Sequence, residues 1–296
     1  MKSGFVAVVG RPNVGKSTLV NSLVGSKVAI TSARPQTTRN TIRGIVTLPP
    51  DGTPEYQVVL VDTPGLHKPR NVLGERLNAL VYGTLADADA VVFIVDATAR
   101  IGPGDRLIAE RLRDADAATI VAVNKVDAAS REQVADQLAE AGDWDFDSYV
   151  AISALDGAGL DVLMEEVTAR LPEGPLYFPP EETTDQPDEL MAAEVVREKY
   201  LDRLRDELPH SLAVVTREMA MRPTGTLYIE AAVIVERSSQ KGIVIGHRGE
   251  MLAQVGKEAR QELESIFGAP VYLDLRVKVE KEWQRREELL DRVLEI

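Results

Sequence analysis

The chain has 296 residues, with 34 basic and 47 acidic side chains and a formal net charge of -13 at pH 7. Its composition, 44% hydrophobic and 27% charged, is typical of a folded globular protein and excludes whole-chain disorder, and its length favours two domains. The acidic balance argues against non-specific nucleic-acid binding by the whole surface but leaves room for a local basic site. The absence of cysteine excludes disulfides, thiolate metal sites and cysteine catalysis, and it suits a reducing cytoplasm.

The first residues, MKSGFVAVVG, enter a strand-like pattern without the long apolar region and cleavage site of a signal peptide. No apolar run approaches the roughly 20 residues that span a bilayer. We therefore expect a cytoplasmic protein without a membrane-spanning helix.

Short runs rich in valine and isoleucine alternate with longer helical patterns up to residue 171. Alternating strands and helices of this kind predict an α/β fold, a mostly parallel sheet covered by helices. The predicted strands are 5–9, 41–48, 57–61, 90–95, 119–123 and 148–152, and the predicted helices begin near Lys16, Leu73, Pro103, Ser130 and Gly159.

The stretch 171–187 is rich in proline, interleaved with glycine and acidic residues, and it cannot continue a helix. We interpret 172–187 as a linker that buries little, between domains at 1–171 and 188–296. The alternative is a long surface loop within one domain.

The pattern after the linker differs, with an α-β-β-α-α-β order and a final helix. Pro223 and Gly225 mark the turn between the first two strands. The predicted elements are a helix at 189–208, strands at 213–221 and 227–236, a short apolar segment at 242–246, a helix at 250–267, a strand at 271–279 and a charged helix at 281–294.

The segment Gly10-Arg11-Pro12-Asn13-Val14-Gly15-Lys16-Ser17 fits the phosphate-loop pattern G-x-x-x-x-G-K-[ST]. Its glycines let backbone amides turn toward phosphate oxygens, and the N-terminus of the following helix faces the same charge. We expect Lys16 to reach the β- and γ-phosphates, Ser17 to place its hydroxyl on Mg²⁺, and Thr18 to belong to the same site.

A second motif, Asp62-Thr63-Pro64-Gly65, follows the strand predicted at 57–61. Asp62 can hold Mg²⁺ through water, and the Gly65 amide can meet the γ-phosphate. In the loop at 34–39 we favour Thr38 over Thr37 as a further Mg²⁺ ligand when the γ-phosphate is present. Leu66 stands where small signalling GTPases carry a water-orienting glutamine. Leucine cannot bond to water, so we expect slow hydrolysis, or water positioned by another group or a partner.

A third motif, Asn124-Lys125-Val126-Asp127, selects the base. A carboxylate at Asp127 can accept two hydrogen bonds from the imino and amino groups of guanine, a donor pair that adenine lacks. Asn124 is expected to brace the loop and the stem of Lys125 to cover the base, while Ser153-Ala154 offers a backbone amide. Three motifs in this order predict a GTPase that prefers GTP over ATP.

In the second half, Gly246-His247-Arg248-Gly249 matches the GxxG loop through which KH domains hold a nucleic-acid backbone. Basic residues outnumber acidic ones from 237 to 260, which suits a narrow RNA groove on an acidic chain. The alternative is a glycine turn with solvated charges. The candidate RNA contacts are Arg237, Lys241, Gly246, His247, Arg248, Gly249, Lys257 and Arg260.

The order of GRPNVGKST, QTTR, DTPGL and NKVD, followed by the pattern of the second half, closely resembles the bacterial Era GTPases over nearly the whole chain. The resemblance implies a Ras-like P-loop GTPase domain and a smaller α+β KH domain of bacterial (type II) topology. It also implies GTP or GDP with Mg²⁺, and K⁺ as an additional charge beside Asn13. Asn40 stands where a histidine is frequent, and we expect no functional consequence.

By the same resemblance, the chain is expected to bind small-subunit ribosomal RNA near its 3′ end and to act in maturation of that subunit. We expect a monomeric GTP switch in the cytoplasm, with peripheral association at the inner face of the cell membrane. The alternatives are a housekeeping GTPase whose second domain binds protein, and a membrane-linked signalling GTPase. An RNA-modifying enzyme is disfavoured because the second half offers neither a nucleophile nor a metal cluster, and His67 and His210 lack ligand-like spacing.

Overall fold

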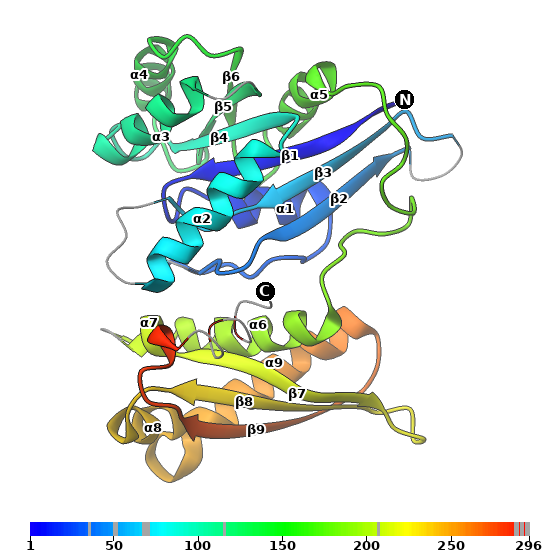
Figure 1. The fold of residues 1–296 in the computed structure, drawn as a ribbon, viewed down its shortest axis with the longest axis vertical. Coiled ribbons are helices and arrows are strands. Elements are labelled where there is room, and N and C mark those ends of the chain that lie inside the picture. Colours follow the sequence, from blue (N-terminus) through cyan, green and yellow to red (C-terminus); the bar gives the residue numbers. More distant parts are fainter. Residues whose placement is uncertain are drawn as a thin grey trace. The chain divides into compact units, whose positions relative to one another are not determined.

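The computed structural model describes residues 1–34, 37–49, 53–66, 72–114, 117–205 and 208–286, together with 290 and 293. Contacts divide the chain into two compact units (Figure 1): unit 1 comprises Met1–Ala29 and Thr38–Asp185, and unit 2 comprises Ile30–Thr37 and Gln186–Ile296. Each unit has its own sheet and its own buried core.

Unit 1 contains a six-stranded sheet in the order β2-β3-β1-β4-β5-β6. β2 and β3 are antiparallel, and the other neighbours are parallel, which confirms the predicted α/β fold. The strands are β1 (Lys2–Gly10), β2 (Ile42–Leu48), β3 (Tyr56–Asp62), β4 (Ala90–Asp96), β5 (Ala118–Asn124) and β6 (Ser148–Ile152).

Alternate side chains of the central strands enter two cores, one on each face of the sheet. Val6 and Val8 of β1 pack with residues of α1 and α5, whereas Ala7 and Val9 pack with residues of α2, α3 and α4. This burial on both faces explains why the strands read as continuous apolar runs. The helices are α1 (Lys16–Val24), α2 (Val72–Ala86), α3 (Pro103–Arg113), α4 (Arg131–Gly142) and α5 (Leu160–Arg170).

The proline-rich segment after α5 lies along unit 1 as far as Asp185. The buried Gln57 side chain donates to the carbonyl of Phe178 at 2.9 Å and accepts the amide hydrogens of Tyr177 and Phe178 at 2.8 and 3.0 Å. The Tyr177 ring also meets Phe5 edge-on, with 4.9 Å between the ring centroids. Much of the segment is exposed, yet specific hydrogen bonds hold it in place.

Unit 2 contains a three-stranded sheet in the order β7-β8-β9, with β7 antiparallel and β9 parallel to β8. Helices α6 and α9 supply Val195, Tyr200 and Leu263 to a core shared with Ile229 and Val233 of β8. The elements are α6 (Asp188–Leu201), α7 (Leu208–Ser211), β7 (Ala213–Met221), β8 (Leu227–Val235), α8 (Ser238–Ile245), α9 (Glu250–Phe267) and β9 (Val271–Val279).

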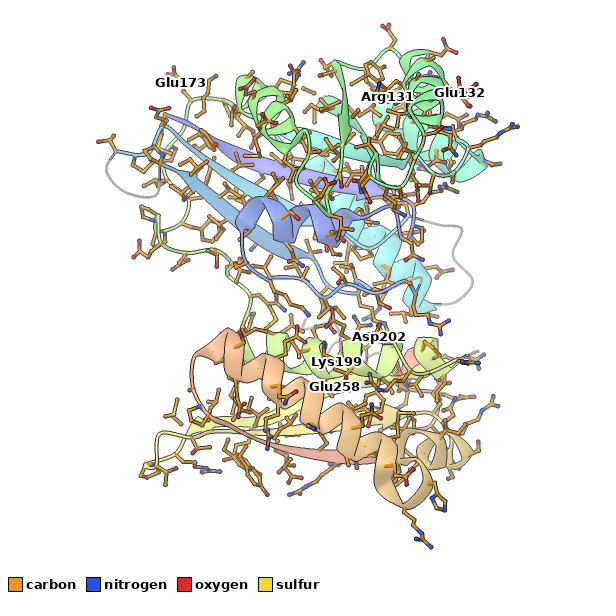
Figure 2. The ribbon with its side chains drawn as sticks, turned by 180° about the vertical axis from the view of Figure 1, so that it is seen from behind. Arg131, Glu132, Glu173, Lys199, Asp202 and Glu258 are labelled. Atoms are coloured by element: carbon orange, nitrogen blue, oxygen red, sulfur yellow. The ribbon has the colours of Figure 1, made fainter. Side chains whose placement is uncertain are left out.

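Ion pairs join α6 and the turn after it to α9. Lys199 pairs with Glu262, and Arg203 pairs with Glu258 at 2.5 Å. Lys199 of α6 and Glu258 of α9 are labelled in Figure 2. All four side chains are partly buried, so these pairs are screened less than fully exposed ones and help to fix how α6 packs on α9.

Three predicted elements of unit 2 differ from the structure. The helix predicted at 189–208 ends at Leu201, and Leu208–Ser211 forms the separate helix α7. Pro209 has no N–H and is compatible only with the first turn of a helix. The apolar segment predicted at 242–246 is the end of α8. As far as residue 286, the predicted closing helix is a 3₁₀ turn at Trp283–Arg285, and most residues beyond it lie outside the described part.

Residues Ile30–Thr37 belong to unit 2 by their contacts, although they come early in the sequence. Arg197 of α6, only 1% exposed, donates a hydrogen bond to the carbonyl of Thr37. This part of the chain is therefore anchored on α6 and the turn after it. Two further bonds run from the Thr31 amide to Glu198 Oε1 at 2.8 Å and from Arg34 Nη2 to the Leu204 carbonyl at 2.9 Å.

Trp283 anchors the end of the described chain in unit 2, because it is fully buried and its Nε1 donates to the Ser211 carbonyl at 2.8 Å. We expect Trp283→Ala to lower the free energy of unfolding of unit 2 by about 3–5 kcal/mol, since it leaves a cavity and an unpaired carbonyl. Hydrogen exchange followed by mass spectrometry checks this: peptides of β8 should lose protection while those of β4 keep it. Unchanged protection of β8 would contradict the assignment.

Candidate functional site

The phosphate loop joins β1 to α1, and a close contact fixes its position against β5. Gly15 has φ 104°, and a Cβ atom there would lie 2.3 Å from Nδ2 of Asn124. A side chain would therefore be both strained and blocked, which explains the glycine. The same Nδ2 donates to the carbonyl of Val14 at 2.8 Å, so the first and third motifs are in direct contact.

Lys16 lies at the base of this loop with only 6% of its surface exposed. Its Nζ donates to the carbonyls of Gly10 and Arg11 at 3.3 and 3.0 Å. Burial lowers the pKa of Lys16 to about 8, although the nearby Asp62 carboxylate opposes the shift. A negative charge beside the loop would offset the cost of burying the ammonium group. The site therefore favours binding of a phosphate next to Lys16.

The three predicted Mg²⁺ ligands lie together at the carboxyl end of β3. Ser17 Oγ donates to Asp62 Oδ2 at 2.6 Å, and Thr38 Oγ1 lies 3.0 Å from Ser17 Oγ and 3.4 Å from Asp62 Oδ2. The hydroxyl of Thr37 instead donates to the Arg34 carbonyl at 2.7 Å. Of the two threonines, Thr38 is therefore the one whose side chain reaches this cluster.

The Asp62 carboxylate is fully buried, and within the described residues its Oδ1 has no hydrogen-bond partner. Burial raises the pKa of Asp62 to about 6, against the opposing effects of the Lys16 charge and the hydrogen bonds from Ser17 and Thr38. An orphaned carboxylate oxygen beside two hydroxyls is a hard, all-oxygen donor set. The cluster fits a Mg²⁺ ion.

The residues after Asp62 turn back toward the phosphate loop. Thr63 Oγ1 donates to the Val8 carbonyl at 2.8 Å, and the Leu66 amide donates to the Gly10 carbonyl at 3.3 Å. A Cβ atom at Gly65 would lie 2.8 Å from the Pro12 nitrogen, so Gly65 permits the close approach of these two loops. The Leu66 side chain is 8% exposed and packs in the core beside Val9. Residues 67–71, including His67, lie outside the described residues, as do 35, 36 and the His210 side chain.

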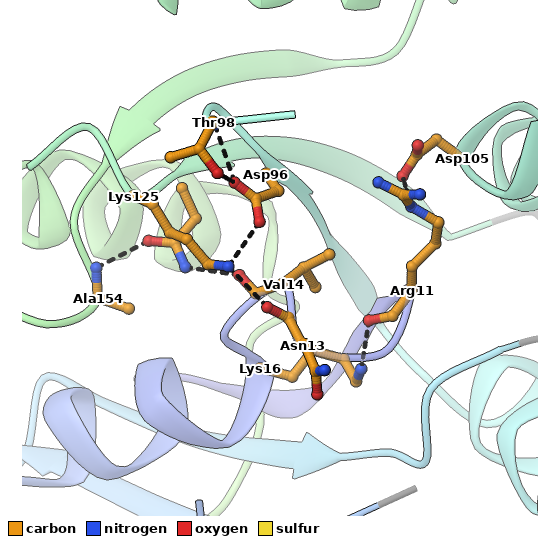
Figure 3. Close-up of polar contacts among 10 residues, drawn as sticks. Arg11, Asn13, Val14, Lys16, Asp96, Thr98, Asp105, Lys125 and Ala154 are labelled. Carbon is orange, nitrogen blue, oxygen red and sulfur yellow. Dashed lines mark hydrogen bonds and ion pairs between the residues drawn. The ribbon is translucent and has the colours of Figure 1, made fainter. Parts of the chain in front are cut away.

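Hydrogen bonds and an ion pair hold the side chains of the base-reading motif in place. Asn124 Oδ1 accepts the Ala154 amide at 2.8 Å, and Ser153 Oγ donates to Asp127 Oδ1 at 2.7 Å. Lys125 Nζ donates to the Asn13 carbonyl at 2.7 Å and pairs with Asp96 at 2.5 Å (Figure 3). Asp127 is exposed, as a carboxylate that reads a ligand must be. Sequence reasoning did not find Asp96, whose role depends on β4 lying beside β5.

Unit 2 holds the second candidate site, which begins at the GxxG loop between α8 and α9. Gly246 has φ 77°, and a Cβ atom there would lie 2.7 Å from Met251 Cβ, so this glycine is required. Gly249 has φ 86° with nothing within 4 Å of its Cβ position. The second glycine thus leaves the backbone open to a ligand.

A groove of about 490 Å³ runs from Gly249 between α9 and β9. Lys257 and Arg260 of α9 line it, opposite apolar residues of β9 such as Leu273. Gly256 and Tyr272 also line this groove, and sequence reasoning missed both.

The other predicted RNA contacts are distributed around the GxxG loop. Gly246 and His247 line a second cavity of about 600 Å³ with Arg34 and Arg203. Arg237, Lys241 and Arg248 line neither of these two cavities.

The described residues contain no cluster of three or more histidine, cysteine, aspartate or glutamate side chains that could hold a metal. Within the same residues, no helix has the length and apolarity needed to cross a membrane.

Fold and sites together define a Ras-like GTPase domain followed by a KH domain. The family model described as "50S ribosome-binding GTPase" matches residues 5–125, and the KH domain model matches residues 207–284. GTPase Era of Mycobacterium avium (strain 104) is 50% identical over 99% of this chain and 98% of its own, and GTPase Era of Mycobacterium tuberculosis (strain H37Rv) is 50% identical over 98% of both.

Two solved structures are similar over almost the full length. An Aquifex aeolicus Era variant bound to GDP.AlF4⁻ has TM-score 0.93, with 40% identity over 99% of each chain. Era in complex with MgGDPNP and nucleotides 1506–1542 of 16S ribosomal RNA has TM-score 0.94, with 40% identity over 99% of this chain and 98% of its own. The chain belongs to the Era family of GTPases.

We expect Asp127→Asn to weaken GDP binding by about tenfold to a hundredfold, because the carboxylate that pairs with the guanine donors is lost. Binding of xanthosine diphosphate should improve, since the asparagine amide can donate to the extra carbonyl of xanthine. Competition against a fluorescent nucleotide measures both changes. Asp161→Asn makes the same charge change on an exposed helix and serves as the control. Equal guanine affinity in the two variants would refute the assignment.

Proposed function

We propose that this chain is a GTP-hydrolysing switch that binds small-subunit ribosomal RNA near its 3′ end and assists maturation of the small ribosomal subunit. The observation that carries the RNA part is the groove between α9 and β9, with its GxxG glycine and two cationic side chains. KH domains hold single-stranded RNA in such a groove. The Era complex with nucleotides 1506–1542 of 16S ribosomal RNA supports this choice of RNA.

In this proposal, residues 1–171 form the GTPase domain, 172–187 the linker, and 188–296 the KH domain with its C-terminal segment. The two separate cores support a division into two domains. The contacts of Gln57 with Tyr177 and Phe178 mean that the first part of the linker stays with the GTPase domain.

The geometry of unit 1 supports the following nucleotide roles. Backbone N–H groups of the phosphate loop, from Gly10 to Thr18 apart from Pro12, hold the phosphates, and Lys16 neutralises charge at the β- and γ-phosphates. Ser17, Thr38 and Asp62 hold Mg²⁺, which when bound supplies positive charge at the same oxygens. The base is held by 124–127 and by the amide of Ala154. Asn13, whose carbonyl is bonded by Lys125, is the residue beside which K⁺ would add charge.

Hydrolysis proceeds by in-line attack of water on the γ-phosphate. Lys16 and the Gly65 amide stabilise the charge that develops there. The Leu66 side chain is packed in the core and offers no group that could orient the water. We therefore propose that intrinsic GTP hydrolysis is slow and that a group supplied by a partner accelerates it.

The nucleotide state reaches the RNA-binding unit through adjacent threonines. Thr38 belongs to the Mg²⁺ cluster of unit 1, whereas the Thr37 carbonyl is held by Arg197 of unit 2. Because the two residues share a peptide bond, ordering of Thr38 by GTP restrains the segment that Arg197 holds.

The cell location in this proposal is the cytoplasm, where small subunits are assembled. Peripheral association with the inner face of the cell membrane and a monomeric state complete the proposal. Liposome sedimentation with and without RNA, and analytical ultracentrifugation, test these two parts separately.

We expect Thr38→Val to abolish any difference in RNA affinity between the GTP-analogue and GDP forms, because valine keeps the shape of threonine but removes the hydroxyl from the cluster. Thr37→Val is the matched control, since the Thr37 hydroxyl bonds the Arg34 carbonyl instead. Fluorescence anisotropy with labelled RNA measures the affinities. Equal behaviour of the two variants would contradict this route of coupling.

We expect Gly249→Asp to weaken RNA binding by at least about tenfold, because it places a negative charge where the phosphate backbone approaches the GxxG loop. Gly25→Asp adds the same charge and a similar backbone strain after α1 in unit 1, at φ 77° with nothing within 4 Å. Filter binding of both variants with 16S ribosomal RNA nucleotides 1506–1542 compares them. Equal affinities would favour a second domain that binds protein.

A further inference from the structure

Two tyrosines stack on the sheet of unit 2, on the face opposite α6 and α9. Tyr228 of β8 stands directly opposite Tyr272 of β9 in the strand register. Their ring centroids are 5.8 Å apart, and the ring planes differ by 13°. On β9, Leu273 and Leu275 alternate with Tyr272 and pack on the core, so the tyrosine pair is not part of that core.

A guanidinium group covers Tyr228. The Arg222 Cζ atom lies 4.4 Å from the centroid of the Tyr228 ring, which is a cation–π contact. Arg222 follows β7, and Glu218 of β7 holds it at 2.8 Å. Since β7 and β9 flank β8 on opposite sides, the order across the sheet is Arg222, Tyr228, Tyr272.

Tyr272 is the outer layer of this stack. β9 is the last strand of its sheet, and the Tyr272 side chain is 62% exposed. One face of its ring meets Tyr228, and the other looks past the edge of the sheet. A ring already held by its neighbours loses little conformational freedom when it binds a further planar group.

The edge occupied by Tyr272 belongs to the candidate RNA groove. Tyr272 lines the groove of about 490 Å³ together with Gly249, Lys257 and Arg260. A nucleobase stacked on Tyr272 can therefore belong to a strand whose phosphates lie beside the two cations. Stacking on an aromatic ring is open to any base because every base has a π-face.

The balance of charge differs between this face of the sheet and its edge. Glu230 and Asp274 lie on the same face as the tyrosines, and both contact Arg276, at 3.3 and 2.8 Å. Glu218 is paired with Arg222, and Lys278 lies on the same side of β9, so the charges on this face are balanced. Phosphates gain no net attraction there, whereas at the edge they meet Lys257 and Arg260. The strand therefore follows the edge and presents one base to Tyr272.

We propose that Tyr272 stacks a nucleobase of bound single-stranded RNA at the open edge of the KH sheet. The base adds one further layer to the stack formed by Arg222, Tyr228 and Tyr272. This inference rests on the proposed RNA-binding function and adds to it a stacking site outside the GxxG loop. Tyr228 and Arg222 act as positioning residues that hold the Tyr272 ring.

The test uses the full chain and RNA of 16S nucleotides 1506–1542, with affinity measured by fluorescence anisotropy. Tyr272→Ala removes the ring from an exposed position and should weaken binding about tenfold. Tyr272→Phe keeps the ring and should bind within about twofold of the unchanged protein. Equal affinity of Tyr272→Ala and the unchanged protein overturns the proposal.

A second measurement separates stacking from mere support of the sheet edge. Single abasic nucleotides are placed along the RNA, and each RNA is titrated against the unchanged protein and against Tyr272→Ala. Stacking predicts one position whose abasic form weakens binding to the unchanged protein but has no effect on Tyr272→Ala. If every abasic position has the same effect on both proteins, Tyr272 stacks no base and the proposal is wrong.

Failure of the stacking site and failure of the RNA function give different results. If Gly249→Asp loses affinity relative to Gly25→Asp while Tyr272→Ala does not, the groove binds RNA and the stacking proposal alone is overturned. If Gly249→Asp and Gly25→Asp bind equally, the proposed RNA function fails, and the stacking proposal fails with it.

Discussion

The side chain of Asn124 is the contact on which the nucleotide site depends. Only 2% exposed, it donates to the Val14 carbonyl and accepts the Ala154 amide, each at 2.8 Å. It thereby fastens the phosphate loop and the loop after β6 to the end of β5, three segments far apart in the sequence. Both polar groups of the amide are used, and Gly15 leaves the room they need. Shifting any of the three segments would leave a buried amide unpaired, which is costly enough to keep the site formed before a ligand arrives.

A second constraint acts at the phosphate end, where buried charges lie without full compensation. Burial lowers the pKa of Lys16 to about 8 and raises that of Asp62 to about 6, so each charged form is disfavoured relative to water even though the two groups attract each other. A phosphate and a divalent cation supply the missing opposite charges, the first to Lys16 and the second to Asp62. The two buried charges therefore favour binding of a phosphate and of a divalent cation at this end of the site.

The sequence predicts the local parts of this molecule better than the long-range ones. The helix at 250–267 and the strand at 271–279 were predicted to the residue, because a glycine limits the helix at each end and strict alternation marks the strand. Contacts between distant segments could not be predicted. Arg197 meets a carbonyl 160 positions earlier, and Gln57 reads as an ordinary strand residue until the segment after α5 is seen against it. The Tyr272 stack likewise requires knowing that β9 pairs with β8 in this register.

Leu66 serves the packing of the loop after β3 and does not serve the hydrolysis of GTP. Its amide bonds the Gly10 carbonyl, and its side chain fills the core beside Val9, so this residue ties the loop after β3 to β1 rather than serving the reaction. A polar side chain buried at that place would lack partners and would destabilise the loop. Stability of the loop requires an apolar side chain at position 66, whereas orientation of the attacking water requires a polar one. Leucine satisfies the first requirement. The Leu66 side chain therefore gives no help in orienting the attacking water.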